Sequence, residues 1–499
     1  MTEFKKILRY LIFALLIFSC QKNETPQFVA RVDDQLVTPQ EFADRYRFNP
    51  YLTGIKNQSE ARKVALSALI AEKLLAAEAH RKGFTNPESE RWIEEHLREA
   101  MIEQLRRDSV EKEITVTDEE LRREYRKALK KIRAKFYLCS DSLAAVQVAQ
   151  RLKSGASGRQ AVAGVRQKLV TVTQKEYAWP VENEHMEKLI YNLHEGEISP
   201  PQRVREGFLV AQVQKVTTVS KPSQQDFESR LPALRDHLLR RKIKARYTHF
   251  YRKQLVSRLG AVDWTVLSAA LEKILPEIDF HQPKTATPFG QMKSLPDRIV
   301  ESPENVLKNL ARRVAVRFPS GKQWTVRQLF SRIKYGPYAF NYSDPEKFRK
   351  SFRDNVRLLL EHQAIYEMAN ELGYRENPQV VREAAMWNSY YTAQAFRYHL
   401  LSDLKTTESP EKNRPEGDLT PLQEKRLQFM DEFLTSALSR HEVIINQKVF
   451  AEWTAPKTDM LVMKRHFAHR LIAPRLQPLT RLTRWQKQID RLYRKYGIG

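Results

Sequence analysis

Residues 193–210 read LHEGEISPPQRVREGFLV, and this stretch decides the fold of the central part of the chain. Gly196 and Pro201 stand in a polar segment, as expected where a chain turns. The second half enters an apolar run that continues to Val216, which is typical of a buried strand. The stretch therefore predicts a turn that leads into the last strand of a small sheet.

The segment around this stretch differs in composition from its neighbours. Residues 132–218 contain short apolar runs rich in β-branched residues, with turns at 154–158 and 195–201. Charged helical patterns flank the segment over residues 116–131 and 225–259. We predict one compact α+β module inserted between helices.

One pattern occurs twice in the chain. VDDQLVTPQEF near the N-terminus and FPSGKQWTVRQLF in the second half each predict a short strand and turn entering a helix. Aligning the two pairs Thr38 with Thr325, and it pairs Phe42 with Leu329 on the inner face. A strand-like ending also recurs, as AVDWTVL after the basic helix and as HEVIINQKVF after a helix at 423–439.

A long helix follows the strand and turn in each copy, over residues 59–83 and 344–373. Each ends at a glycine suited to the position after a helix, and a further charged helix follows at 88–110 or 379–400. The apolar stripes that then align are Leu66, Leu69, Ile70 and Ala79 in the first copy and Val356, Leu359, Leu360 and Ala369 in the second. We infer a duplicated helical unit with the α+β module only in the first copy; the alternative is that two amphipathic hairpins simply look alike.

The composition indicates a folded, basic protein of several domains. Net charge is +25, with 29% charged and 41% hydrophobic residues. Such basicity favours anionic partners. Because no spacing typical of a nucleic-acid-binding motif is found, we do not expect nucleic acid to be one of these partners. The tail over residues 456–499 carries eleven Lys and Arg against two Asp, and it predicts either a packed terminal helix or a docking element for an anionic partner.

The N-terminus has the features of an export signal. Lys5 and Lys6 precede an apolar run at 11–18 that is too short to span a bilayer. The sequence Ile-Phe-Ser-Cys that follows resembles a bacterial lipobox, which implies cleavage before Cys20 and lipid attachment to it; the alternative is an uncleaved anchor. Gln21 after the cysteine implies, by the same resemblance, the outer membrane, facing the periplasm. Cys139 is then the one remaining thiol, predicted to be buried and inert.

The whole arrangement resembles the SurA/PrsA/PpiD class of exported foldases. In that class an N-terminal helical chaperone domain is completed by a C-terminal helix and strand, with a parvulin-type prolyl isomerase domain inserted between them. The residues that carry the parvulin resemblance are Gly196, Glu197, Ile198, Ser199 and Gly207. The fold implied is mainly α with one α+β module: SurA-like helical units in tandem, the first carrying the inserted parvulin-like domain.

The resemblance and the repeat together predict eight segments. They are a lipoprotein signal peptide (1–20), a first helical unit (28–131), the parvulin-like domain (132–218), a helix and strand completing unit one (222–275), a linker (280–309), a second helical unit (310–405), a helix and strand completing unit two (419–455) and the basic tail (456–499).

The parvulin pocket carries over position by position. Its two histidines fall on Phe136 and Leu209, its phenylalanine on Met186 and its methionine on Glu182. Prolyl isomerisation needs no nucleophile and no cofactor, but it does need a pocket that favours the twisted amide through polar groups. The replacements imply a degenerate site, in which His185 is the one histidine worth testing as a catalytic group.

The function expected from these features is that of a membrane-anchored periplasmic chaperone that binds unfolded or assembling outer-membrane and other envelope proteins. Two alternatives stay open: a working parvulin-type isomerase, and an accessory lipoprotein subunit of an outer-membrane assembly or secretion complex. No cofactor is expected, and no metal site is expected because His466 and His469 lack further ligands nearby.

Overall fold

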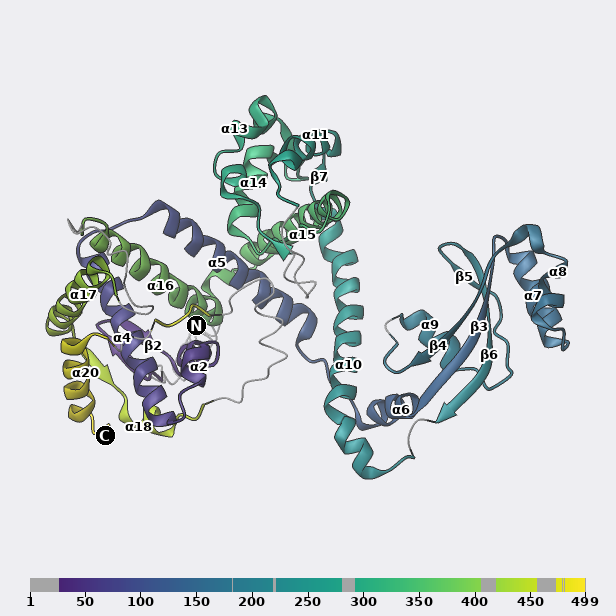
Figure 1. Ribbon diagram of the computed structural model, residues 1–499, viewed down its shortest axis with the longest axis horizontal. Coiled ribbons are helices and arrows are strands. Elements are labelled where there is room, and N and C mark those ends of the chain that lie inside the picture. Colours follow the sequence, from purple (N-terminus) through teal and green to yellow (C-terminus); the bar gives the residue numbers. More distant parts are fainter. Residues whose placement is uncertain are drawn as a thin grey trace, which may run out of the picture. The chain divides into compact units, whose positions relative to one another are not determined.

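The computed structural model describes residues 27–181, 183–218, 221–280, 292–404, 419–455, 473–477, 479 and 481–498. The predicted signal peptide and Cys20 lie outside the described residues, as do Glu182, His466 and His469. The chain is mainly helical with one α+β module, as the sequence predicts (Figure 1). Among the described helices, none combines the length and the apolar content needed to cross a bilayer. The chain forms two compact units, one of them Arg107–Gln254 and the other the remainder.

The first copy of the repeat begins with a hairpin that enters a helix. Its elements are β1 (Ala30–Val32), β2 (Gln35–Val37), α2 (Pro39–Arg47), α3 (Pro50–Thr53), α4 (Gln58–Arg81) and α5 (Pro87–Arg106). The Thr38 hydroxyl accepts a hydrogen bond from the Glu41 N–H and so caps α2. Phe42 is fully buried on the inner face of α2. Gly83 has a φ of 63°, the left-handed conformation that ends α4.

The second copy repeats this local chemistry. Its elements are β9 (Val314–Arg317), β10 (Gln323–Thr325), α14 (Val326–Tyr335), β11 (Phe340–Asn341), α15 (Pro345–Glu371) and α16 (Pro378–Ser402). Thr325 caps α14 and Asp344 caps α15, each by accepting a backbone N–H at the third helical position. Gly373 has a φ of 75°, matching Gly83. All eight residues of the two predicted apolar stripes are buried, so the helical spacing was interpreted correctly.

The two copies exchange their terminal strands. Strand β12 (Val443–Ile445), near the end of the chain, pairs antiparallel with β1 of the first copy. Strand β7 (Ala261–Val262) pairs antiparallel with β9 of the second copy. The prediction that residues 222–275 complete unit one and residues 419–455 complete unit two is therefore wrong, because each strand adds to the hairpin of the other copy.

Two further expectations about segments are corrected. Only the first two residues of AVDWTVL form a strand, because Asp263 caps helix α11 (Trp264–Ile274) by accepting from the Val266 N–H. The predicted linker 280–309 is folded from residue 292 onward, where β8 (Met292–Lys293), α12 (Asp297–Val300) and α13 (Pro303–Leu307) lie. Ile299 and Leu307 are buried in the second core, which explains why this polar stretch is ordered.

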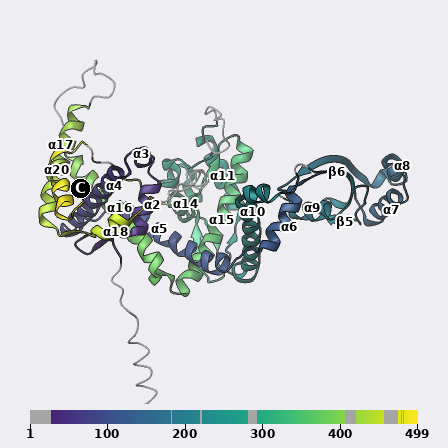
Figure 2. The same ribbon diagram turned by 90° about the horizontal axis from the view of Figure 1, so that it is seen from below.

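The first core combines both ends of the chain. It is completed by α17 (Pro421–Arg440), β12, α18 (Gln447–Glu452) and α20 (Thr483–Lys495), which lie beside α4 and the end of α16 (Figures 1 and 2). Trp485 is fully buried, its indole N–H donating to the Ser67 hydroxyl at 2.9 Å. Its backbone N–H donates to a carboxylate oxygen of Asp431 at 2.7 Å. The end of the basic tail is thus a packed helix, the first of the two possibilities for this segment.

The second core lies around α11, α12, α14 and the first half of α15. Its largest fully buried side chain is Trp324 on β10, whose ring contacts Phe318 edge-on at 4.7 Å between centroids. Helix α5 packs against α15 and α16, and so joins the two copies of the repeat.

The unit Arg107–Gln254 contains the α+β module between two helices. Its elements are α6 (Asp118–Ala128), β3 (Lys130–Cys139), α7 (Ser142–Lys153), α8 (Gly158–Ala163), β4 (Leu169–Ala178), α9 (Glu184–Tyr191), β5 (Gln202–Val204), β6 (Gly207–Thr218) and α10 (Gln224–Phe250). The four strands form an antiparallel sheet in the order β4-β3-β6-β5. α7 and α8 pack on one face and α9 on the other. Cys139 is buried under α7, and burial raises the pKa of its thiol, in agreement with an inert side chain.

Candidate functional site

The residues predicted at the parvulin pocket come together on the α9 face of the sheet. Phe136 on β3 and Leu209 on β6 share this face with Met186 on α9. Leu209 lies opposite Leu138, and Phe136 lies opposite Ala211, so the two predicted positions are diagonal neighbours across adjacent strands. The Phe136 side chain is buried, and its ring contacts Tyr177 edge-on at 5.8 Å between centroids.

The chemistry of this face is that of a hydrophobic core. Its buried members are Ile132, Ala134, Phe136, Ile190, Ala211 and Val213. Within the described part of the cluster, Tyr177 and Tyr191 supply the hydroxyl groups. Burial raises the pKa of both phenols, that of Tyr191 to about 12, so both stay neutral at physiological pH. Neutral phenols on an apolar face can bind a chain, but they provide no group that changes charge near pH 7.

The two histidines of this region, His185 and His194, are both exposed to solvent. His185 is exposed on α9, whereas Met186 on the same helix is half-buried and Ile190 is buried. His194 is exposed in the turn that follows, where its backbone N–H donates to the Glu197 carboxylate at 2.8 Å. Both imidazoles are therefore exposed, whereas the residues that form the α9 face are buried or half-buried.

The residues that carry the predicted parvulin resemblance have structural roles in this chain. Gly196 has a φ of 82° in the turn, and Ile198 forms an isolated bridge to Gln212. The fully buried Ser199 exchanges hydrogen bonds with Ala211, accepting at its hydroxyl from the Ala211 N–H at 2.9 Å. Gly207 has a φ of 145°, and a Cβ there would lie 2.2 Å from the Cys139 carbonyl oxygen, so only glycine fits.

Strand β4 is a long, exposed edge of the sheet. It spans ten residues and pairs only with β3 among the described strands. Val170 and Val172 are 53% and 37% exposed, unusually high for valine in a strand. The first six residues, Leu-Val-Thr-Val-Thr-Gln, carry no charge and no proline. Natural sheets usually protect such an edge with charged residues, proline or a bulge, because it can pair with another chain. In β4 the register is irregular at Val170 and charges follow at Lys175 and Glu176, so residues 171–174 are the regular, uncharged part of the edge.

An ionic cluster joins α6, α9 and α10 within the same unit. Glu124 accepts from the Trp179 indole N–H at 2.7 Å and from Lys127 at 3.0 Å, while His237 Nε2 lies 3.3 Å from it. Lys127 also donates to Glu187 at 2.7 Å, and Arg241 donates to both oxygens of Glu187. Burial alone would raise the pKa of Glu124, but the contacts from His237, Trp179 and Lys127 outweigh it and lower that pKa to about 2.

Glu124, Glu187 and His237 lie close enough to one another to ligate a metal ion. Two cations, Lys127 and Arg241, already neutralise the two carboxylates, so the cluster is complete as a set of ion pairs. Sequence reasoning missed this cluster because its members are spread over more than a hundred residues and no local motif connects them.

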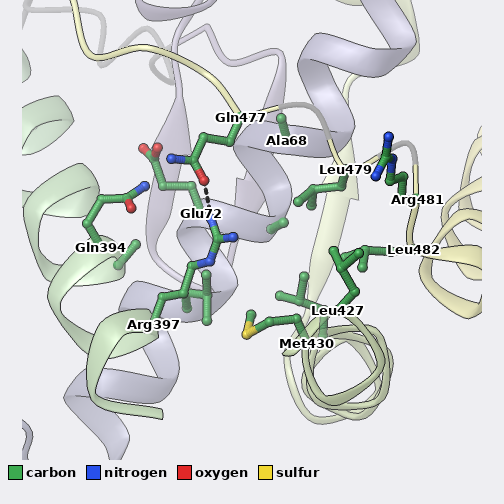
Figure 3. A pocket seen from close by; sticks show the side chains of 14 residues that line it. Ala68, Glu72, Gln394, Arg397, Leu427, Met430, Gln477, Leu479, Arg481 and Leu482 are labelled. Atoms are coloured by element: carbon green, nitrogen blue, oxygen red, sulfur yellow. Dashed lines mark hydrogen bonds between the residues drawn. The ribbon is translucent and has the colours of Figure 1, made fainter. Parts of the chain in front are cut away.

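A cavity of about 210 Å³ lies in the first core, outside the α+β module. Figure 3 shows its walls, formed by α4, α16, α17 and the segment before α20. The apolar lining residues are Ala68, Ala71, Leu75, Ala393, Leu427, Met430, Leu434, Leu479 and Leu482. The polar lining residues are Glu72, Gln394, Arg397, Gln477 and Arg481. No sequence motif marks this cavity, because it exists only once the two ends of the chain pack together.

Comparison with known proteins identifies similar solved structures but no family. No family model matches the chain, and no curated protein matches it. The peptidylprolyl isomerase PrsA from Bacillus cereus is 15% identical over 38% of this chain and 80% of its own, with a TM-score of 0.21. PrsA from Bacillus anthracis is 12% identical over 37% of this chain and 96% of its own, with a TM-score of 0.19. A structure from Campylobacter jejuni, described as a SurA-like chaperone, is 15% identical over 46% of this chain and 98% of its own, with a TM-score of 0.19.

Proposed function

We propose that this protein is a chaperone that holds unfolded or assembling envelope proteins and that its parvulin-like module binds chains without isomerising them. The proposal includes anchoring to the outer membrane through a lipid on Cys20, with the folded part in the periplasm. The observation that carries the binding function is the uncharged part of the β4 edge, residues 171–174, because a strand edge without charges accepts an extended chain through backbone hydrogen bonds.

The apolar α9 face next to this edge suits the same role. An added strand would continue the sheet beyond β4, and its side chains would alternate between the two faces. Those on the α9 side would extend the surface that begins with Tyr177 and Phe136. Backbone pairing is independent of the client's sequence, which is what a chaperone for many partly folded proteins requires.

The edge is tested by placing charges on it. We expect the double variant Val170→Lys/Val172→Lys to suppress aggregation of a denatured outer-membrane protein less well, with client affinity reduced roughly tenfold, or about 1.4 kcal/mol. Light scattering after dilution of the client from urea measures the effect. Val146→Lys is the matched control, because Val146 is 39% exposed on α7 and away from the edge. Failure of the unaltered protein to suppress aggregation at any ratio contradicts the function itself.

We expect no catalysis of prolyl isomerisation. The α9 face offers neutral phenols and alkyl groups in place of polar groups that respond near pH 7, so the twisted amide is not stabilised. A protease-coupled assay on a proline-containing peptide should give the uncatalysed rate with the unaltered chain and with His185→Ala alike. Activity that disappears in His185→Ala would show that the exposed imidazole is catalytic and would favour the isomerase alternative.

A further inference from the structure

The cavity in the first core contains a positive charge without a matching negative one. Arg397 on α16 points into it beside Gln477, to which its guanidinium donates a hydrogen bond (Figure 3). Among the described residues no carboxylate lies within ion-pair distance of Arg397. Burial lowers the pKa of this guanidinium, and no neighbouring charge offsets that effect. A half-buried arginine in such a setting is complementary to an anion.

The carboxylate of Glu72, which lines the same cavity, is already paired with another cation. Glu72 also lines the cavity, but both of its oxygens accept from the buried Arg45, at 2.8 and 2.6 Å. Lys73 is likewise paired, with Glu41 at 3.1 Å. The structure thus provides carboxylate partners for the buried cations on this part of α2 and α4, but among the described residues it provides no carboxylate for Arg397.

Two amide side chains flank the Arg397 guanidinium. Gln394 lies three residues before Arg397 on α16 and therefore on the same face of the helix. Gln477 approaches from the segment before α20, on the other side of the opening (Figure 3). Amide groups can donate to and accept from a peptide group, so the polar rim matches a carboxylate with a peptide bond next to it.

Apart from Glu72 and Arg481, the rest of the lining is apolar, and the cavity is small. Leu427, Met430 and Leu434 on α17 face Ala68, Ala71 and Leu75 on α4 across it. Its volume of about 210 Å³ is below the range of roughly 300 Å³ and more that is typical of sites for drug-sized ligands. The space suits one apolar side chain rather than a long acyl chain.

We propose that this cavity binds the free C-terminal carboxylate of a polypeptide whose last residue is apolar. The carboxylate pairs with Arg397, the last peptide group with Gln394 and Gln477, and the last side chain enters the apolar space between α4 and α17. The site goes beyond the holding function proposed above, because strand addition at β4 requires no chain end and would persist without it.

Binding of a peptide to the full chain tests the site. The probe is a fluorescently labelled hexapeptide that ends in leucine with a free carboxylate, and the comparison peptide ends in the leucine carboxamide; fluorescence anisotropy measures both. We expect the acid to bind at least about tenfold more tightly than the amide, since the amide lacks the charge that Arg397 complements. Arg397→Gln should remove this difference, and Arg397→Lys should restore part of it.

A control variant and the results that would contradict the site complete the test. Arg382→Gln is the matched control on the exposed side of the same helix and should leave acid binding unchanged. Equal affinity for acid and amide, or an Arg397→Gln variant that still prefers the acid, overturns the site. Displacement of the acid peptide by octanoate but by no unlabelled peptide acid would also overturn it, by showing that the cavity takes a fatty acid. Suppression of aggregation should be unchanged in Arg397→Gln, which separates this site from the holding function.

Discussion

A chain that ends at residue 418 is expected to lose the core around α4 while keeping the core around α15. The truncation removes β12, the partner of β1, and it removes α17, α18 and α20, which cover the apolar face of α4. The loss includes the fully buried Trp485, and truncating such a side chain to alanine alone costs about 3–5 kcal/mol. Since whole domains are stable by only about 5–15 kcal/mol, the first core should not form.

Hydrogen exchange measures this outcome directly. In the truncated chain the amides of α4 should exchange quickly, while those of β9, α14 and the first half of α15 should remain protected. The matched control is Val262→Asp in the full chain, which disturbs β7 and should weaken protection of β9 while leaving α4 protected. The reverse pattern, with α4 protected and β9 exposed after truncation, would mean that each copy is completed by the strand that follows it in sequence.

The exchange of strands could not be predicted from the sequence for a physical reason. Helix caps such as Thr38, Thr325 and Asp344 are local, because the capping residue and the N–H that it satisfies are three residues apart. Strand pairing is not local: β7 and β12 follow similar helices, and either could add to either hairpin. Loop-closure entropy grows only slowly with chain length, so the distance along the chain does not decide between the two pairings.

The functional features also divide into those that depend on local sequence and those that depend on contacts between distant segments. The turn at Gly196, where φ is 82°, follows from local sequence, whereas the close approach of Gly207 to the Cys139 carbonyl depends on the pairing of two distant strands. The cavity around Arg397 and the cluster around Glu124 join residues from distant segments, each of them an ordinary charged or apolar residue in its own helix. A single sequence shows that these residues exist but not that they meet.

Replacement of Glu124 tests the cluster that joins α6, α9 and α10. We expect Glu124→Ala to destabilise the unit Arg107–Gln254 by about 3–5 kcal/mol, the usual cost of removing one partner from a buried ion pair. The Glu124 side chain is only 3% exposed, and its removal takes the hydrogen-bond acceptor from the Trp179 indole N–H, whereas Lys127 keeps Glu187 as a partner. Urea denaturation followed by hydrogen exchange of α6 and α10 measures the change. Glu119→Gln on the same helix is the control, because the Glu119–Arg123 pair is at the surface and such pairs contribute little.

The same carboxylate makes the stability of this unit depend on acid. Its pKa in the folded chain is lowered to about 2 from an ordinary value of 4.5, so the unfolded chain binds the proton more readily. The contribution is therefore fully present above about pH 4.5 and is lost as the pH falls toward 2, by about 3 kcal/mol at 1.36 kcal/mol for each pH unit. Glu124→Gln should remain less stable at pH 6, yet lose less stability than the unaltered chain between pH 5 and pH 2.5. Equal losses in the two proteins over this range would show that other carboxylates, and not Glu124, govern the acid response of α6 and α10.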